Sequence, residues 1–320
     1  MRPLAIAALV ASVVAGCSVV SIDLTPRIRP LEEQTVDGHG DAKILLMDLS
    51  GFLSDDLGSG GLILGTSPPR VPLLVRVREE LEKAAEDRKV KAVVLKINSP
   101  GGTVTASDIL YHELQDFRRR TARPIVAVVM DVAASGGYYV ALAADTIVAH
   151  PTSVTGSIGV ILVTINADGL LQKIGVSAAA ITSGPYKDMG SPLRALTPEE
   201  RAIFQSVIDD FYGQFVSKVA DRRRIAPETA RKLADGRIYT AQQALADKLI
   251  DRIGYVPDAL HLARAAAGVQ EARIIVYQRP RAYRATYYAG SKGEAQSEMP
   301  LARLAAMLTS GPKFLYLWWP

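Results

Sequence analysis

Ser135 is the side chain of this sequence that is best placed to act as a nucleophile. It stands in the stretch 130–140, between a β-rich run over 124–129 and a helix-like run over 138–144. Its neighbours are two alanines and two glycines, small residues that expose a hydroxyl and let another backbone approach closely. A serine on a strand-to-helix turn is a common way to present a nucleophile, and nearby N–H groups can point at the carbonyl that it attacks. The alternative interpretation is a tight turn whose small residues serve packing.

A serine nucleophile needs a base that takes its proton. The four histidines of the chain, none of them within a motif, are His39, His112, His150 and His261. Lysine is the alternative base, provided that burial favours its neutral form. Lys187 stands in the irregular loop 183–192, where glycine and proline bracket it as in an active-site wall. From the residues alone, a Ser-His-Asp triad and a pair of Ser135 with Lys187 both stay open.

Five short motifs occur in a compatible order along the chain. They are 97–102 (INSPGG), 134–139 (ASGGYY), 155–159 (TGSIG), 183–188 (SGPYKD) and 236–240 (GRIYT), the last followed by LID at 249–251. Each motif is weak alone, but together they resemble the signal peptide peptidase A family, also called protease IV, of bacterial membrane-associated serine peptidases. The resemblance covers residues 43–277. It implies an α/β fold of the Clp protease and crotonase superfamily, built from stacked ββα units.

The resemblance also implies roles for three side chains. Ser135 would be the nucleophile. Lys187 would be the general base, which takes the hydroxyl proton and later passes it to the leaving amine. Ser157 matches the family serine that hydrogen-bonds the lysine and orients it. We expect no metal and no cofactor here.

Glycines would form the oxyanion hole. The donors implied by the resemblance are the backbone N–H groups of Gly136 and of Gly101 or Gly102, where a side chain would block the approaching carbonyl. The short members of the family form ring- or dome-shaped oligomers with active sites built across neighbouring subunits. In a homo-oligomer of that kind, Ser135 and Lys187 of the same chain need not meet.

The start of the sequence predicts a lipid anchor. A positive charge at Arg2 precedes an apolar run over 4–14, which is too short to span a bilayer. Small residues then precede Cys17, the one cysteine of the chain, and this end resembles a bacterial lipobox. We therefore predict a lipoprotein signal peptide over 1–16, a lipid on Cys17, and a place in the bacterial cell envelope, facing the periplasm or the extracytoplasmic space. The alternative is an ordinary signal peptide with an incidental cysteine.

Strand and helix patterns alternate through most of the chain and predict one layered α/β peptidase domain over 42–277, with largely parallel strands. Strands are expected at 42–49, 91–97, 124–129, 146–149, 176–182 and 273–277, and helices at 72–89, 105–120 and 198–223, with Thr105 as the cap of the second helix. The polar residues 17–41 predict a tether, and 50–70 a long mobile loop. Residues 278–320 predict a C-terminal extension whose apolar end packs on the domain or on another subunit, the favoured interpretation, or rests at a membrane interface.

Charge and composition narrow the function. The net charge is +4 and the charges are interspersed, so nucleic-acid binding is not indicated. The leading hypothesis is a membrane-anchored serine endopeptidase with a Ser-Lys dyad that cleaves apolar peptides, such as signal-peptide remnants or misfolded envelope proteins. One alternative is an acyl-CoA hydratase-like activity, which would need acidic residues beside the oxyanion glycines and a cytoplasmic location. Another is a catalytically inactive envelope scaffold with the same fold.

Overall fold

A computed structural model of the 320-residue chain describes residues 30–55, 71–280, 286–288 and 313–318. Cys17 with the predicted signal peptide, most of the predicted loop 50–70 and most of the predicted extension 278–320 lie outside the described residues. Within those ranges, no helix has the length and apolar character needed to cross a membrane.

A mostly parallel β-sheet forms the centre of the molecule. Its main strand order is β1-β11-β2-β3-β5-β6-β10. The bounds are β1 (Glu32–Asp37), β2 (Lys43–Ser50), β3 (Val90–Ser99), β5 (Ile125–Ala134), β6 (Thr146–Ala149), β10 (Arg252–Ile253) and β11 (Arg273–Gln278). Only β1 runs antiparallel to its neighbour in this series. The short β7 (Val154–Gly156) lies parallel to the end of β5 and pairs on its other edge with β9 (Ile238–Thr240).

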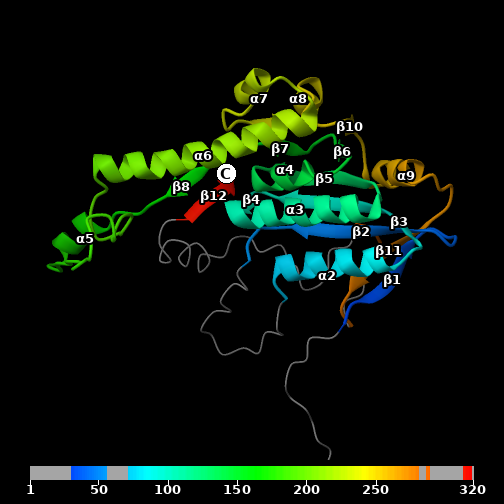
Figure 1. The fold of residues 1–320 in the computed structure, drawn as a ribbon, viewed down its shortest axis with the longest axis horizontal. Helices are drawn as coiled ribbons and strands as arrows, with labels where there is room; N and C mark the ends of the chain where they lie inside the picture. Colours follow the sequence, from blue (N-terminus) through cyan, green and yellow to red (C-terminus); the bar gives the residue numbers. More distant parts are fainter. Residues whose placement is uncertain (1–29, 56–70, 281–285, 289–312, 319–320) are drawn as a thin grey trace, which may run out of the picture.

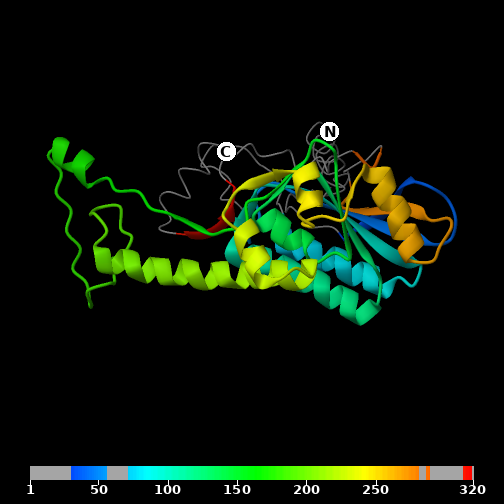
Figure 2. The same cartoon turned by 90° about the horizontal axis from the view of Figure 1, so that it is seen from above.

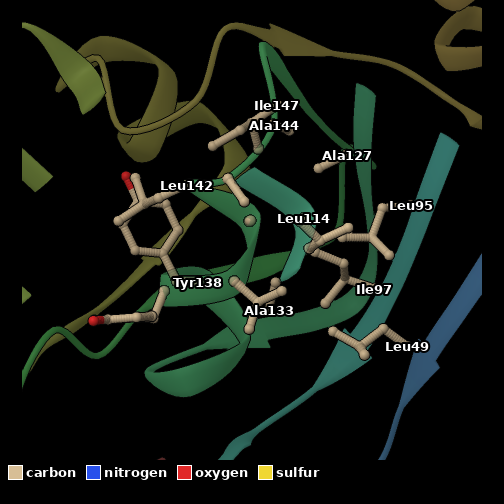
Figure 3. Close-up of a cluster of buried hydrophobic side chains, with 14 of the residues drawn as sticks. Leu49, Leu95, Ile97, Leu114, Ala127, Ala133, Tyr138, Leu142, Ala144 and Ile147 are labelled. Atoms are coloured by element: carbon tan, nitrogen blue, oxygen red, sulfur yellow. The ribbon is translucent and has the colours of Figure 1, made fainter. Parts of the chain in front are cut away.

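Helices cover both faces of this sheet, because successive side chains of a buried strand point to opposite faces. Leu45, Leu95 and Ala127 belong to the core cluster shared with α2 (Leu73–Glu86), α3 (Val104–Thr121) and α4 (Gly136–Ala141). Figure 3 shows this packing, with Leu95 of β3 beside Leu114, and Tyr138 of α4 on the other side of the same cluster. The intervening residues of the same strands pack against α9 (Val256–Ala266) on the other face. The order of layers is therefore helix, sheet, helix, as predicted for an α/β domain.

An arm projects from this body. It consists of β8 (Ile161–Val163), α5 (Asp168–Lys173), the segment 174–197 and the first half of α6 (Pro198–Arg223), and both views show it extending well beyond the sheet (Figures 1 and 2). The second half of α6 returns to the core, where Phe215 and Val219 are buried. Gly213 stands between the two halves, with open space where a Cβ would be. The chain then continues through α7 (Pro227–Leu233) and α8 (Ala241–Ala246).

A second, three-stranded sheet joins the body to the end of the chain. Its order is β4-β12-β8, with β4 at Gly101–Thr103 and β12 at Lys313–Leu317, and both pairings are antiparallel. The ring of Tyr316 packs against Tyr139 and Phe215 at centroid distances of 5.1 and 4.8 Å. Its hydroxyl donates to the Phe211 carbonyl at 2.9 Å. The apolar end of the chain therefore packs on the domain, one of the two packing alternatives expected from the sequence.

The structure corrects three local predictions. Residues 32–37 of the predicted tether form β1, since the edge of β11 has backbone groups to pair. The predicted strand 176–182 is irregular and exposed, and no described strand lies beside it. The cap of α3 is Thr103, whose side chain accepts from the Ala106 N–H at 3.2 Å, and Thr105 lies inside the helix.

Candidate active site

Ser135 occupies a strained turn between β5 and α4. Its backbone has φ 51° and ψ −114°, a conformation that L-residues rarely adopt and that costs about 1–3 kcal/mol. Two hydrogen bonds hold it there: its N–H donates to the Gly156 carbonyl at 2.7 Å, and its carbonyl accepts from the Tyr139 N–H at 2.8 Å. The residue is 1% exposed. Such a strained strand-to-helix turn is the geometry in which hydrolases commonly present a nucleophilic serine.

Glycine backbones converge beside this turn. A Cβ on Gly101, where φ is +108°, would lie 2.9 Å from the Gly136 nitrogen, and a Cβ on Gly136 would lie 3.2 Å from the Gly101 Cα. The structure thus brings the two glycine motifs of the sequence together, and neither position has room for a side chain. The approach of a substrate carbonyl to these glycines, expected from the sequence, stays a prediction.

The backbone contacts also separate Gly101 from Gly102. The Gly101 N–H donates to the Ser99 hydroxyl at 3.1 Å. The Gly101 carbonyl and the Thr103 N–H both bond to Leu53, at 2.9 and 2.8 Å. Because backbone groups of successive strand residues point to opposite edges, those of Gly102 face away from Leu53, toward β12. Of the two candidates, Gly102 therefore has its N–H directed at the edge of β4 that pairs with β12.

Ser157 starts its turn next to Ser135. In the parallel pairing of β5 with β7, Ala134 is opposite Gly156, so the two serines follow neighbouring strand ends about 4.8 Å apart. Ser157 also has a positive φ, 49°, and its N–H donates to the Arg237 carbonyl at 2.7 Å. It lines a cavity of about 480 Å³ between the β7–β8 turn, α6 and Leu317. A group entering this cavity would therefore come close to Ser157, whereas Ser135 is not part of the cavity lining.

Lys187 lies elsewhere in the same chain. It is exposed on the segment 174–197, which both views place at the end of the arm away from α4 (Figures 1 and 2). Phe215 packs on Tyr139 of α4, and the helix axis from there back to Pro198 measures about 26 Å at 1.5 Å per residue. The structure therefore brings Ser135, Ser157 and the glycines together but does not bring Lys187 to them.

Histidine does not take the place of the lysine. All four histidines lie in described residues, and the structure records no hydrogen bond from any of them to Ser135. His150 bonds to Thr152, at 2.9 Å, and His39 pairs with Glu271 on the surface, at 3.2 Å. His112 and His261 are exposed on α3 and α9. The geometry gives no support to a Ser-His-Asp triad within one chain.

The sequence does not reveal the strand that lies in front of the glycines. The pairing of β12 with β4 places Tyr316 opposite Gly102, and a Cβ on Gly101 would lie 2.0 Å from the Tyr316 carbonyl oxygen. The Trp318 N–H donates to the Pro100 carbonyl at 2.8 Å. Only the apolar, aromatic composition of 314–319 hinted at this contact, because pairing between residues so far apart leaves no local pattern.

Comparisons with known proteins fit this site. The model of "Peptidase family S49" matches residues 118–270, and that of "Clp protease" matches residues 74–155. A Synechocystis sp. protein named provisionally as protease slr0021 is 45% identical over 192 residues, 60% of this chain and 69% of that protein. A Methanocaldococcus jannaschii protein named provisionally as protease MJ0651 is 34% identical over 266 residues, 82% of this chain and 84% of that protein.

A third relative carries the family name. It is an Enterococcus faecium protein, named provisionally as signal peptide peptidase SppA, which is 35% identical over 261 residues, 82% of this chain and 74% of that protein. The α/β fold is thus the Clp protease and crotonase-like fold expected from the motifs. With this agreement of sequence and strained serine turn, the chain belongs to peptidase family S49, the signal peptide peptidase A family of serine peptidases.

Proposed function

We propose that this protein is a membrane-anchored serine endopeptidase whose catalytic pair forms between copies, with Ser135 of one chain and Lys187 of a neighbour. The observation that carries the proposal is the separation within one chain. Ser135 and Ser157 lie at adjacent strand ends, whereas the arm holds Lys187 about 26 Å of helix away. An arm of this length is the means by which one copy would reach the site of the next.

The surface of the arm supports contact with another copy. It exposes large apolar side chains, which in a single chain would face water: Leu170, Ile174, Val176, Ile181 and Leu193. Exposed apolar clusters of this kind mark protein–protein contacts. A contact between two different surfaces, arm and body, closes into a ring when the rotation between copies permits it. The cavity beside Ser157 is the place where the neighbouring lysine would enter.

The reaction would follow from these groups. The neutral amine of Lys187 takes the Ser135 hydroxyl proton as the oxygen attacks the peptide carbonyl. The N–H groups of Gly102 and Gly136 stabilise the oxyanion, and the lysine then protonates the leaving amine. Water, deprotonated by the same lysine, hydrolyses the acyl-enzyme and restores Ser135. Ser157 would hold the lysine by a hydrogen bond.

The substrate would be an extended, apolar peptide. One edge of β4 already pairs with Leu53, while the other edge accepts an antiparallel strand, as β12 shows. A peptide bound along this edge would gain main-chain hydrogen bonds, with side chains in alternate pockets. Signal-peptide remnants and misfolded envelope proteins have this character. The atoms nearest to Gly101 and Gly136 are hydroxyl and backbone atoms, with no carboxylate, which disfavours the hydratase alternative.

Mixing two inactive variants tests whether the catalytic pair forms between copies. Ser135→Ala and Lys187→Ala would each abolish peptide cleavage by the assembled protein. When the two are co-assembled in equal amounts, about a quarter of the interfaces of a ring would join an intact Ser135 to an intact Lys187, and activity would return to that level. Co-assembly of Ser135→Ala with the double variant is the control and would stay inactive.

Two outcomes would contradict this proposal. Undiminished cleavage by Lys187→Ala would remove the lysine from the mechanism. No recovery in a mixture shown to contain both variants in one assembly would refute pairing between copies. A correctly assembled wild-type protein that neither hydrolyses peptides nor reacts with a fluorophosphonate would favour the inactive scaffold. The anchor is tested separately: intact-mass measurement of membrane-extracted protein should show a lipid on Cys17 that Cys17→Ser lacks.

A further inference from the structure

The residues around Lys187 form a compact turn. The Lys187 N–H donates to the Gly184 carbonyl at 3.2 Å, the Met189 N–H to the Tyr186 carbonyl at 3.2 Å, and the Ser191 N–H to the Asp188 carbonyl at 3.0 Å. These bonds shape the turn from within. They do not attach it to the rest of the arm, so other contacts must decide where the exposed lysine points.

Arg194 attaches this turn to α6. Its Nε and Nη2 donate to the two carboxylate oxygens of Asp188 at 2.8 and 2.7 Å, and Asp188 is the residue after the lysine. Its Nη1 also donates to Glu200 Oε2 at 2.9 Å. A guanidinium that holds one carboxylate with two parallel hydrogen bonds fixes direction as well as distance. The carboxylate next to Lys187 is thus held in one orientation.

Glu200 gives this clamp a rigid base. It is 1% exposed and belongs to the first turn of α6, where its carboxylate accepts from the Thr197 N–H at 3.0 Å. The Thr197 hydroxyl in return accepts from the Glu200 N–H at 3.2 Å. This reciprocal cap, together with Pro198 at the first helical position, defines the helix start without Arg194. A second tie, from the Ala167 N–H to the Pro192 carbonyl at 2.7 Å, joins the segment to the start of α5.

We infer that Arg194 is a positioning residue for Lys187, which clamps the lysine-bearing turn to the first turn of α6 so that the amine reaches the neighbouring Ser135 in one geometry. The inference rests on the proposed function of Lys187. It adds that the direction of the base is set by an ion-paired arginine seven positions away. Since α6 has its own cap and a buried second half, loss of Arg194 releases the turn and leaves the helix in place.

The test compares Arg194→Met, Arg194→Lys and Asp188→Asn in the full chain. Arg194→Met should lower kcat by about 10²-fold, as expected for a catalytic group displaced by about 1 Å, with KM changed less than about two-fold. Arg194→Lys should recover part of this loss, since an ammonium contacts both carboxylates without the paired geometry. If Arg194 acts through Asp188, the double variant Arg194→Met with Asp188→Asn should have a kcat no lower than that of the less active single variant.

Arg201→Met is the matched control. Arg201 is an exposed arginine in the same turn region of α6, and the structure records no ion pair for its side chain among the described residues, so kcat should not change. Assembly size and thermal unfolding are measured for every variant. Wild-type kcat in Arg194→Met would overturn the inference, as would a loss that is explained by lost assembly or folding. Cleavage by Lys187→Ala at the wild-type rate would instead refute the proposed function.

Discussion

Removal of β12 should make the edge of β4 accessible while the body stays folded. The perturbation is a chain that ends at residue 312. In the intact protein, β12 lies along β4 with Tyr316 opposite Gly102, which is the edge that a peptide substrate would use. The strand would then compete with substrate for the same backbone groups, and its removal should increase the apparent affinity for peptides.

The magnitude follows from the burial of the strand. Leu315, Tyr316 and Leu317 are buried, and three such side chains stabilise by about 7 kcal/mol in all. A few ladder hydrogen bonds add about 1 kcal/mol each. Ordering the six described residues 313–318 costs about 9 kcal/mol at about 1.5 kcal/mol per residue. Burial and hydrogen bonding together exceed the cost of ordering by only a few kcal/mol, so the docking free energy of β12 is about 1–3 kcal/mol.

A docking free energy of this size excludes peptide by a factor of about 5 to 150. The truncated chain should therefore show a KM lowered by such a factor, with kcat unchanged. The assay is hydrolysis of a fluorogenic peptide that carries an apolar, extended sequence. A chain that lacks only residues 319–320 keeps β12 and should behave as wild type. The reasoning would be refuted by a truncated protein that is folded and assembled yet has lost hydrolysis, because β12 would then be part of the catalytic wall.

Three further predictions concern the glycines, the strained serine and the clamp. Gly101→Ala should lower kcat by about 10²–10³-fold in the peptide assay, because a Cβ there would lie 2.9 Å from the nitrogen of Gly136 and displace this oxyanion donor. Gly51→Ala, also at positive φ but with open space around it, should lower only the free energy of unfolding, by about 1 kcal/mol. The free energy of unfolding of Ser135→Gly should exceed that of Ser135→Ala by about 1 kcal/mol, because only glycine relieves the strain at φ 51°. Ser135→Gly should therefore unfold at the higher temperature, and equal midpoints would contradict this strain. Hydrogen bonds from the Arg194 guanidinium lower the pKa of Asp188 and that of Glu200 from their ordinary values of 3.8 and 4.5. The clamp therefore contributes its full stabilisation at a pH above these ordinary values and loses it as the pH falls through the lowered pKa values. Proteolysis within 183–197 should accelerate below about pH 4 in wild type and depend less on pH in Arg194→Met.

Local signals predicted some elements well. The helix α6 was expected at 198–223 and begins and ends there, since Thr197, Pro198 and Glu200 encode its start. The strand β5 was expected to end at 129 but continues to Ala134, because β7 supplies a parallel partner for its last residues. Tertiary pairing of this kind leaves no trace in a short window of sequence. The predicted strand 176–182 failed for the converse reason, as apolar residues without a described neighbouring strand do not pair.

The candidate site likewise has parts that local sequence signals predict and parts that depend on tertiary contacts. Small residues around Ser135 and in the glycine motifs could be recognised from the sequence, because a close backbone approach excludes every larger side chain. Their meeting at one edge of the sheet follows from the parallel order β3-β5-β7, which the sequence predicted only in outline. The position of Lys187 on a projecting arm could not be predicted, since the body and the arm share the same helical pattern along α6. The role of Arg194 needed the distances to Asp188 and Glu200.

The contacts of α6 on either side of Gly213 decide how far the arm can bend. Glycine weakens a helix by about 1 kcal/mol relative to alanine, but α6 is held on both sides of this glycine. Phe215 is buried in the core, and Phe211 packs on Phe314 of β12 at a centroid distance of 5.5 Å. The helix beyond Phe204, which packs on Phe314 at a centroid distance of 6.2 Å, is about 9 Å long, so a rotation of about 1° there moves its far end by about 0.2 Å. Proton transfer tolerates errors of about 0.5 Å. A bend of up to about 3° at Phe204 thus stays within that tolerance, and β12, through Phe314, stiffens the part of α6 from which the arm projects.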